Sequence, residues 1–382
     1  MNIAVNTRLL LKNKLEGIGW FSFETLRRIA ENHPEHNFYY IFDRKYDESF
    51  ISSDNIIPIV AGLPTRHPFL WFLWFEFSIP RVLKRIKADI FVSPDGMLSL
   101  RTKTPQIAII HDISFHHNPY QLPFWVRKYN NYFYKRFADK ATHLGTVSEY
   151  SKSDISESYH IDPNKIDVCY NGSNSAYAPL NQLEKEAIKA KHTNSCEYFV
   201  FIGALNPRKN IPGLLKSYEI FRNSGNYNHK LIIVGSAMHL TGEIDDTLNM
   251  MQHKVDVIFT GRLELEELRH VLGGAMALVF IPYFEGFGIP LVEAMYAETA
   301  IISGDTTSLP EVVGDAALVC SPQDHKKVAE NMEMIANDEK LRQSLIAKGR
   351  IQREKFSWDK SANRFWRCIE KGIEKVQIDK NA

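Results

Sequence analysis

Short apolar runs recur along the whole chain, and each is followed by a polar or glycine-containing loop and then by a helical pattern. Continuous apolar runs of this length are typical of strands that are covered on both faces, as in parallel sheets. In the first half, the runs that predict strands are 3–5, 38–42, 89–92, 106–110, 142–147 and 166–170. In the second half they are 198–202, 231–234, 257–261, 277–281 and 300–302. This alternation of strands and helices predicts an α/β fold.

The length of the chain predicts two domains. It has 382 residues, of which 44% are hydrophobic, and single cores rarely grow beyond about 250–300 residues. Asn171–Gly172 is a turn signal at the end of the first half, and the polar, lysine-rich residues 173–196 predict a linker. The net charge of +1 indicates no nucleic-acid partner.

The cysteines and the apolar runs predict a protein of a reducing compartment. Cys169, Cys196, Cys320 and Cys368 are widely spaced and form no C-x-x-C pair, so we expect free thiols and neither disulfides nor a zinc site. The first residues have the pattern of a strand, which indicates no signal peptide. No apolar run approaches the roughly 18 residues of a membrane-spanning helix. We therefore expect a cytoplasmic location.

Two carboxylates stand at the end of the apolar run 277–281. The pattern places Glu285 in a loop after this strand and Glu293 in the first turn of a helix that begins at Pro290. In open α/β sheets, ligands bind at the carboxyl ends of the strands. We therefore expect both carboxylates at a ligand site, although a surface loop with solvated glutamates is the alternative.

The residues between the two glutamates make the pattern specific. Gly286 and Gly288 let the backbone approach a ligand closely, and the helix start offers N–H groups to an anion. A suitable ligand would offer hydroxyl groups to the two carboxylates and phosphate oxygens to the backbone amides. A nucleotide sugar has both. Residues 285–295 read E-G-F-G-I-P-L-V-E-A-M, which resembles the Glu-x7-Glu signature of glycosyltransferase family 4, the group 1 retaining transferases of GT-B fold.

A pair of cations follows the strand predicted at 198–202. Arg208 and Lys209 then lie in a loop before a helix, beside the Glu285 loop if the sheet is parallel, where they can hold a diphosphate. Solvated surface charge is the alternative. The sequence G-x-x-x-P-R-K-N of residues 203–210 is similar to a motif of the family, with two departures nearby. Ala204 stands where some members have an arginine, and Glu298 stands where a glycine is usual.

The first half carries two weaker signals. Gly17 and Gly19 form a glycine loop between the first strand and the helical pattern 21–30, which fits phosphate binding or a plain tight turn equally well. His111 follows the strand 106–110 and fits either ligand contact or a structural hydrogen bond, with Asp112 orienting it or capping the next turn. The resemblance favours a glycine loop that faces the donor diphosphate and acceptor, and a histidine that borders the sugar.

Two stretches mix aromatic and basic residues. They are residues 68–87, with the core P-F-L-W-F-L-W-F-E-F, and residues 124–136. Helices whose aromatic faces pack on the sheet explain most such stripes, and we favour that interpretation. The alternative is an interfacial surface in peripheral contact with the inner face of an anionic membrane.

The resemblance covers nearly the whole chain and implies two Rossmann-like domains facing each other across a cleft. We expect residues 1–175 with the final helix, 358–382, to form the acceptor-side domain and residues 190–357 to form the nucleotide-sugar-binding domain. By the same resemblance, Glu285 contacts the sugar, Glu293 binds the ribose hydroxyls, and Glu285 and His111 are the catalytic candidates. The donor-binding candidates are Gly17, Gly19, Arg208, Lys209, Gly286, Phe287, Gly288, Ile289, Leu291 and Glu293.

The implied reaction is retaining transfer of a hexose from a nucleotide diphosphate sugar, GDP-mannose-like or UDP-glucose-like, to a hydroxyl of a glycan or lipid-linked acceptor. No Asp-x-Asp motif occurs in the sequence, so we expect no metal site and no cofactor besides the nucleotide sugar, with protein cations stabilising the leaving group. Two alternatives stay open: another GT-B enzyme, such as a sugar-nucleotide epimerase or a phosphorylase, and a nucleotide-sugar-binding protein without catalysis. Hydrolysis of a donor without acceptor would distinguish an enzyme from a binder.

Overall fold

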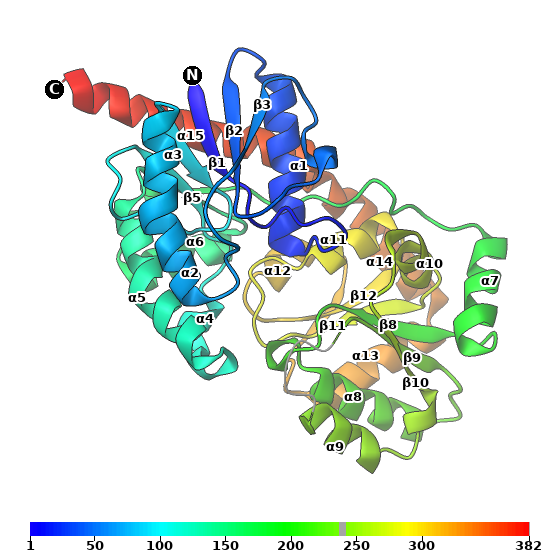
Figure 1. The fold of residues 1–382 in the computed structure, drawn as a ribbon. Helices are drawn as coiled ribbons and strands as arrows, with labels where there is room; N and C mark the ends of the chain where they lie inside the picture. Colours follow the sequence, from blue (N-terminus) through cyan, green and yellow to red (C-terminus); the bar gives the residue numbers. More distant parts are fainter. Residues whose placement is uncertain (237–241, 382) are drawn as a thin grey trace. The chain divides into compact units, whose positions relative to one another are not determined.

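The computed structural model describes residues 1–236 and 242–381, which form two compact units. Met1–Gly172 and Ser357–Ala382 make up the first unit, and Ser173–Phe356 makes up the second. Each unit is a parallel sheet with helices packed against it, as the α/β prediction requires (Figure 1).

The sheet of the first unit has seven strands in the order β3-β2-β1-β4-β5-β6-β7, and every pairing is parallel. Its strands are β1 (Asn2–Asn6), β2 (Asn37–Phe42), β3 (Ile56–Val60), β4 (Ile90–Ser93), β5 (Gln106–Ile109), β6 (His143–Thr146) and β7 (Ile166–Val168). The apolar runs predicted all of these except β3. This strand lies at the edge of the sheet and is partly exposed, and Pro58 within its apolar run weakens the strand signal.

The sheet of the second unit has six parallel strands in the order β10-β9-β8-β11-β12-β13. They are β8 (Tyr198–Ile202), β9 (Lys230–Val234), β10 (Val257–Gly261), β11 (Ala277–Phe280), β12 (Ala300–Gly304) and β13 (Leu318–Cys320). The short edge strand β13 was not predicted. In both sheets the chain order reverses beside the first strand, at β1 and at β8, and open α/β sheets bind ligands outside the carboxyl ends of the strands at this switch point.

The helices of the first unit include one that starts earlier than its pattern predicted. Helix α1 begins at Gly17, and the predicted glycine loop is therefore wrong: Gly17 and Gly19 belong to the first helical turn. Gly19 is buried there, and a Cβ atom at this position would lie 3.2 Å from the Leu9 carbonyl oxygen. The helices are α1 (Gly17–Asn32), η1 (Glu48–Phe50), α2 (Pro68–Leu73), the π-helical turn η2 (Trp74–Ser78), α3 (Ile79–Arg85), α4 (Ser114–His117), η3 (Pro119–Gln121), α5 (Phe124–Lys140), α6 (Glu149–Tyr159), η4 (Pro163–Lys165) and α15 (Trp358–Asn381).

The helices of the second unit include one in the segment that was predicted to be a linker. They are α7 (Gln182–Thr193), η5 (Pro207–Lys209), α8 (Ile211–Asn223), α9 (Gly242–Met250), η6 (Lys254–Asp256), α10 (Leu265–Gly273), α11 (Ile289–Tyr296), α12 (Leu309–Val313), α13 (His325–Asn337), α14 (Glu339–Gln352) and η7 (Arg353–Lys355). The linker prediction for residues 173–196 is wrong over α7. A capping box starts this helix, because the Asn181 side chain accepts from the Glu184 N–H and the Glu184 carboxylate accepts from the Asn181 N–H.

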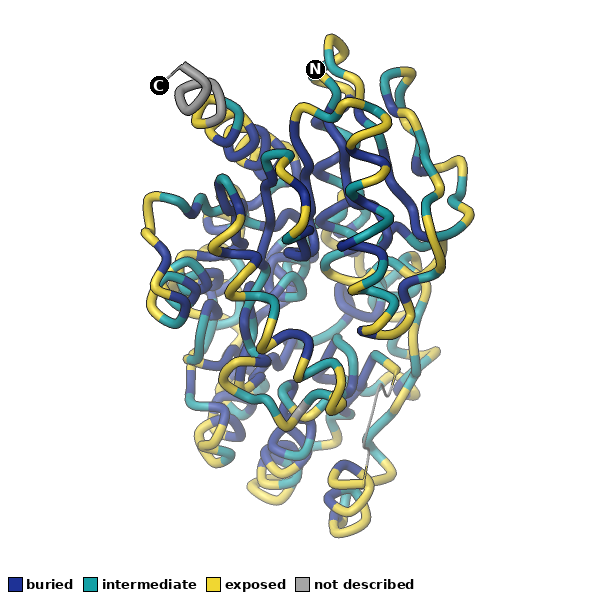
Figure 2. The backbone as a smooth tube through the Cα atoms, turned by 60° about the vertical axis from the view of Figure 1, so that its left-hand side comes forward, coloured by how far each residue is buried: buried dark blue, intermediate teal, exposed yellow. Residues whose placement is uncertain are grey.

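Burial follows the strands in both units. The strands at the centre of each sheet are buried along their length, and the exposed residues lie on the outer helix faces and loops (Figure 2). Helix α15 returns the end of the chain to the first unit, where it packs against α1 and β6. Among the described residues, no helix combines the length and the hydropathy that a membrane span requires.

Candidate active site

The loop after β8 is fixed by one buried asparagine. Asn210 adopts a left-handed backbone conformation, with φ 57°, and caps α8 by accepting the Gly213 N–H at 3.2 Å. Its amide group also donates to the carbonyl oxygens of Ile281, at 3.2 Å, and Pro322, at 2.8 Å. The side chain therefore ties the loop after β8 to the segments that follow β11 and β13.

The two cations of this loop contact the first glutamate of the Glu-x7-Glu motif. Arg208 Nη1 lies 2.9 Å and Lys209 Nζ 2.5 Å from the same oxygen, Glu285 Oε2. Arg208 also donates to the Phe284 carbonyl at 3.0 Å, and its own carbonyl accepts the Tyr283 N–H at 2.8 Å. The predicted adjacency of the Arg208–Lys209 loop and the Glu285 loop is confirmed, because β8 and β11 are parallel neighbours. We call Arg208, Lys209 and Glu285 the charge cluster.

The charge cluster is ionised and partly buried. Burial alone would raise the pKa of Glu285, but Arg208 and Lys209 hold this pKa below its usual value. The Lys209 ammonium lies 4.8 Å from the centroid of Phe280, and its side chain is only 9% exposed, whereas Arg208 is 26% exposed. Two cations share one carboxylate, so the cluster keeps a net positive charge. An anion can therefore bind there without reorganisation of the side chains.

The segment that follows β12 in the chain supports the Glu285 loop. Thr307 Oγ1 accepts the Glu285 N–H at 3.1 Å, and Ser308 Oγ donates to the Glu285 carbonyl at 2.8 Å. Thr306 Oγ1 donates to the Pro282 carbonyl at 2.9 Å. Thr307 adopts φ 55°, which a threonine rarely does, so the contacts around it hold a strained backbone in place.

The helix start after Glu285 offers fewer amides than the sequence predicted. Gly288 caps α11 with φ 98°, and a Cβ atom there would lie 3.0 Å from Leu291, so a glycine fits this position. The Leu291 N–H already donates to the Gly288 carbonyl at 3.0 Å, and Pro290 has no N–H. Phe287 is buried and packs edge-on to Phe356, so it belongs to the core of the unit. The Leu291 amide is therefore engaged within the loop, and its contact with a phosphate stays a prediction.

The second glutamate has the opposite electrostatic surroundings. Glu293 is the fifth residue of α11, so the prediction that it lies in the first turn is wrong. Its partner is the hydroxyl of Tyr177, which is buried and donates to the carboxylate. Among the described residues no cation acts on it, and burial raises the pKa of Glu293 to about 7. The carboxyl group is therefore poised between its neutral and charged forms near pH 7.

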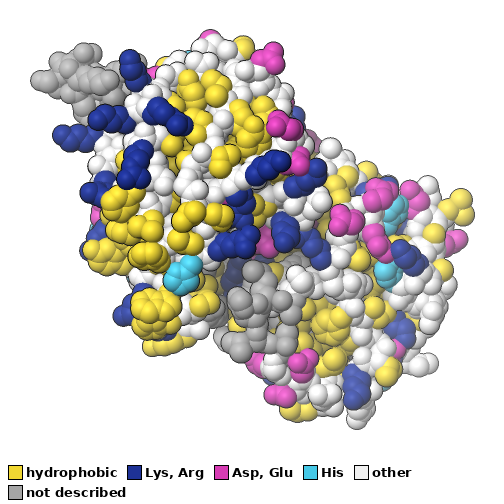
Figure 3. Space-filling view, in the orientation of Figure 1, with side chains coloured by type: hydrophobic (Ala, Val, Ile, Leu, Met, Phe, Trp, Pro, Cys, Tyr) yellow, Lys and Arg dark blue, Asp and Glu magenta, His cyan; other side chains and the backbone are white. Residues whose placement is uncertain are grey.

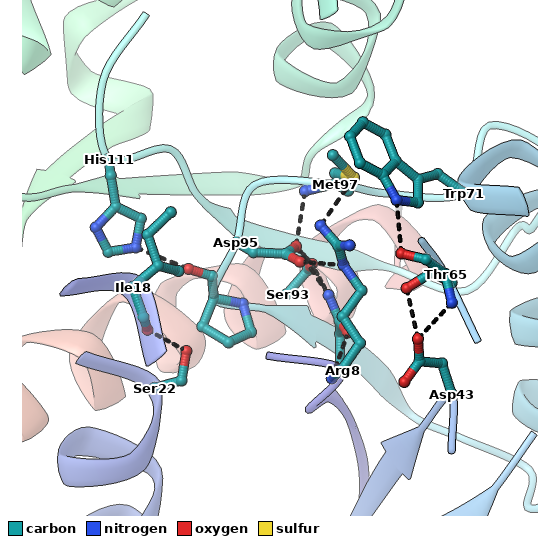
Figure 4. A network of polar contacts seen from close by, with 12 residues as sticks. Arg8, Ile18, Ser22, Asp43, Thr65, Trp71, Ser93, Asp95, Met97 and His111 are labelled. Atoms are coloured by element: carbon teal, nitrogen blue, oxygen red, sulfur yellow. Dashed lines mark hydrogen bonds and ion pairs between the residues drawn. The ribbon is translucent and has the colours of Figure 1, made fainter. Parts of the chain in front are cut away.

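Polar side chains also gather at the carboxyl ends of β1 and β4 in the first unit (Figure 4). Asp95 lies at the centre of this network: Arg8 Nε donates to it at 2.6 Å, and Asn6 Nδ2 donates to it at 2.8 Å. Its other donors are Ser93 Oγ, at 3.0 Å, and the Met97 N–H, at 3.2 Å. Arg8 and Asp95 are both buried. The sequence analysis missed them, although each follows a predicted strand by a few residues.

His111 makes a structural hydrogen bond, which was one of the two roles expected for it. Its Nε2–H donates to the Pro94 carbonyl at 2.8 Å, and its ring packs edge-on against Phe21 with centroids 5.0 Å apart. Burial lowers the pKa of His111, so the ring is neutral near pH 7 and Nδ1 is left as an acceptor. Asp112 caps the following turn by accepting the Ser114 N–H at 2.9 Å.

Comparison with known families identifies the chain. The model for "Glycosyl transferases group 1" matches residues 184–352, and the model for "Glycosyltransferase Family 4" matches residues 16–176. The chain belongs to the group 1 glycosyltransferases of family 4. The resemblance read from residues 203–210 and 285–295 is thereby confirmed.

Individual relatives of this glycosyltransferase agree with that assignment. It is 28% identical to O-antigen chain mannosyltransferase B of Escherichia coli over 91% of this chain and 94% of that protein. It is 29% identical to the O-antigen chain mannosyltransferase RfbU of Salmonella typhimurium, over 74% and 75% of the two chains. The crystal structure of Anabaena HepE in complex with UDP-glucose has a TM-score of 0.71 at 14% identity and covers all of both chains. The GT-B fold with two Rossmann-like units is confirmed.

The site of the glycosyltransferase thus combines expected and unexpected residues. The sequence predicted the meeting of Arg208 and Lys209 with the Glu285 loop. It did not predict Tyr177 beside Glu293, because Tyr177 lies in the supposed linker. It also gave no role to Thr307.

Proposed function

We propose that this glycosyltransferase moves a hexose, mannose in the first place, from a nucleotide diphosphate sugar to a hydroxyl of a glycan or lipid-linked acceptor. The charge cluster at the switch point of the second sheet is the observation that carries the proposal. Two relatives named as O-antigen mannosyltransferases support mannose as the transferred sugar, and GDP-mannose is the donor that we propose for it. A UDP-glucose-like donor is the second candidate, because the structural neighbour HepE binds UDP-glucose.

The donor would be held by two kinds of contact. Arg208 and Lys209 bind the diphosphate, because paired cations match its charge and can make charge-assisted hydrogen bonds to its oxygens. Glu293 accepts hydrogen bonds from the ribose hydroxyls. In its carboxylate form it accepts two such bonds, so a bound ribose favours loss of the proton that the ligand-free carboxyl partly retains at pH 7.

The difficult step is departure of the nucleoside diphosphate. The bond between the anomeric carbon and the phosphate oxygen breaks while negative charge grows on the diphosphate and positive charge grows on the sugar. Arg208 and Lys209 stabilise the first charge, and preorganised cations of this kind contribute several kcal/mol. We propose that Glu285, which the same two cations hold ionised, stabilises the second charge.

We propose that the configuration at the anomeric carbon is retained. The acceptor hydroxyl then attacks from the face that the diphosphate leaves, and the departing phosphate oxygen takes the proton of that hydroxyl. His111 remains a catalytic candidate, since its neutral Nδ1 can accept a hydrogen bond from a sugar hydroxyl. The proposal assigns no step to a metal ion or to a cofactor, and charge stabilisation falls to the protein cations.

We also propose a cytoplasmic location, which the four free thiols support. Intact candidate residues in the charge cluster favour an enzyme over a binding protein without catalysis. A sugar-nucleotide epimerase would convert its substrate without any acceptor and without releasing the nucleotide.

The experiment that tests the proposal combines a donor screen with product analysis. The full chain is incubated with GDP-mannose or UDP-glucose, without acceptor and with candidate glycans, and nucleoside diphosphate release is measured. We expect slow release without acceptor, faster release with a suitable acceptor, and a product with the anomeric configuration of the donor. An inverted product would refute retention. Epimerisation without release, or tight donor binding with no turnover under any condition, would refute the transferase proposal.

A further inference from the structure

We propose that the outer face of α2 and α5 docks the protein on an anionic membrane surface. The docking face consists of aromatic side chains that are between 36% and 88% exposed. They are Phe69 and Phe72 of α2, Tyr120 of η3, and Phe124, Trp125 and Tyr132 of α5. The inference deepens the proposed function, because a protein held at this surface meets lipid-linked acceptors.

Packing on the sheet does not explain these side chains. Other aromatic residues of the same segments cover the sheet and are buried, among them Trp74, Phe75 and Phe137. The Trp74 indole N–H is even satisfied internally, by the Ala61 carbonyl at 2.6 Å. The favoured interpretation of the sequence, core packing, therefore holds for the inner side of the two helices and fails for the outer side.

The exposed aromatic residues form one surface. Trp71 of α2 packs edge-on against Tyr129 of α5 with centroids 5.3 Å apart, and Phe72 lies 6.1 Å from Phe133. The two helices are therefore neighbours. In the space-filling view, hydrophobic side chains gather over this part of the first unit with Lys and Arg side chains beside them (Figure 3).

Cations lie directly on the docking face. The Arg136 guanidinium stacks 3.8 Å from the centroid of Tyr132, and Arg127 lies 5.0 Å from the centroid of Tyr120. Lys128 lies 5.7 Å from the centroid of Phe124. Long basic side chains beside interfacial aromatic rings are typical of proteins that bind anionic headgroups.

The charge of this region differs from that of the chain. Residues 61–140 contain 12 Lys and Arg against 5 Asp and Glu, whereas the whole chain contains 46 against 45. Two of the five acids point inward: Glu76 accepts the N–H groups of Leu100 and Arg101, and Asp95 pairs with Arg8. Each cation near an anionic membrane contributes about 1 kcal/mol, so the region is strongly attracted to such a surface.

The same charge argues against a second copy as the occupant of the docking face. In a two-fold symmetric dimer the face would meet itself, and Arg127, Lys128 and Arg136 would meet the same cations. A cavity of about 330 Å³ lies beside α2, and its lining is mostly apolar with one cation. Its lining comprises Gly62, Leu63, Leu70, Leu73, Trp74, Phe77, Ser78 and Arg81.

Vesicle binding tests the proposal with the full chain. We expect co-sedimentation with phosphatidylcholine vesicles that contain about 30% phosphatidylglycerol, weak binding to pure phosphatidylcholine, and release at about 0.5 M salt. Two double variants test the face, one without aromatic side chains (Trp125→Ala with Phe69→Ala) and one without cations (Lys128→Gln with Arg136→Gln). Each should weaken partitioning onto the vesicles about tenfold or more. Matched controls lie on the second unit: the exposed apolar pair Met250→Ala with Ile351→Ala, and the exposed cations Lys326→Gln with Lys348→Gln. These controls should bind vesicles like the wild type.

Three outcomes would overturn the docking proposal. The first is absence of vesicle binding at low salt, and the second is equal loss in the test and control variants. A dimer that the docking-face variants dissociate would instead assign the face to a second copy. Donor hydrolysis without acceptor should stay unchanged in all four variants, so its failure in the wild type would count against the proposed transferase and not against the membrane.

Discussion

The two glutamates of the Glu-x7-Glu motif should affect stability in opposite directions as pH changes. The Glu293 carboxyl group lies beside the Tyr177 hydroxyl, and its removal from water raises its pKa from 4.5 to about 7, although the hydrogen bond from Tyr177 acts in the opposite direction. Glu285 is held by Arg208 and Lys209, which keep its pKa below the usual value despite burial. Replacing each glutamate by glutamine removes the ionisation and keeps the shape of the side chain.

The magnitude for Glu293 follows from linkage. Because the pKa of the folded form is raised, its stabilising contribution is fully present below pH 4.5 and is lost as pH rises through about 7. Each pKa unit corresponds to about 1.4 kcal/mol, so the wild type loses about 2–3 kcal/mol from this group between pH 5 and pH 8. Glu293→Gln does not lose it. Relative to wild type, the variant should therefore gain about 2–3 kcal/mol over that interval, or about 5–10 °C in the unfolding temperature of the second unit.

Glu285→Gln should behave differently. The pKa of Glu285 is lowered, so its contribution is present above pH 4.5 and is lost as pH falls through the folded-state value. The variant leaves Arg208 and Lys209 without their carboxylate and should be about 1–3 kcal/mol less stable than wild type at pH 7 to 8, with the difference shrinking in acid. Nucleoside diphosphate should restore part of this stability, because its charge replaces the missing carboxylate.

Differential scanning calorimetry between pH 4 and pH 8 measures both effects, and it needs neither a donor nor an acceptor. Glu264→Gln, an exposed glutamate of the same unit, is the matched control and should follow the wild type throughout. If Glu293→Gln and wild type had parallel pH profiles, the carboxyl group would titrate normally and the contact with Tyr177 would not isolate it. If Glu285→Gln were as stable as wild type at pH 8, the charge cluster would not exist in solution.

Four further predictions concern the ligand, the metal and one strained residue. Lys209→Ala should weaken nucleoside diphosphate binding by about 1.5–3 kcal/mol in calorimetry, while the exposed Lys216→Ala of α8 should not, and equal affinities would remove Lys209 from the site. The same binding at pH 7 should release a fraction of a proton, measured in buffers of different ionisation enthalpy, because ribose contact ionises the partly protonated Glu293. Glu293→Gln should release fewer protons than the wild type. Turnover should survive excess EDTA, and complete loss restored by manganese or magnesium would refute the metal-independent proposal. Glu298 has φ 55° and pairs with Arg350 at 2.8 Å, so Glu298→Gly should be about 1 kcal/mol more stable than Glu298→Ala in chemical unfolding, and the reverse order would show that the backbone there is not strained.

The fold could be predicted from the sequence wherever a strand is covered on both faces. All eleven apolar runs correspond to strands, and nine of these strands are largely buried, whereas the edge strands β7 and β10 are partly exposed. The two missed strands, β3 and β13, lie at sheet edges and are partly exposed; Pro58 weakens the strand signal of β3, and β13 has only three residues. Helix α7 was missed because its polar residues resemble a linker, while its stability depends on a capping box and on buried Ile188.

The candidate site could be predicted only as far as the topology determines it. Parallel pairing of β8 and β11 was enough to expect Arg208 and Lys209 beside Glu285. The direct hydrogen bonds, the support from Thr307 and the capping by Asn210 depend on loop conformations that no periodic pattern describes. The glycines of α1 were interpreted wrongly, because the Gly-x-Gly pattern suggested a loop. In the structure, close packing against Leu9 is the reason for a glycine at position 19.

The different surroundings of Glu285 and Glu293 explain how one short motif can serve two tasks. Seven residues separate them, yet their charge states depend on partners that are distant in sequence: Arg208 and Lys209 for Glu285, and Tyr177 for Glu293. A carboxylate that is permanently ionised beside two cations suits a centre where charge develops during the reaction, so Glu285→Gln should mainly lower kcat. A carboxyl group that ionises when hydroxyls approach suits ground-state binding, so Glu293→Gln should mainly raise the donor KM. Steady-state kinetics with the donor found in the screen decides between them, and a full kcat in Glu285→Gln with none in Glu293→Gln would reverse the assigned roles.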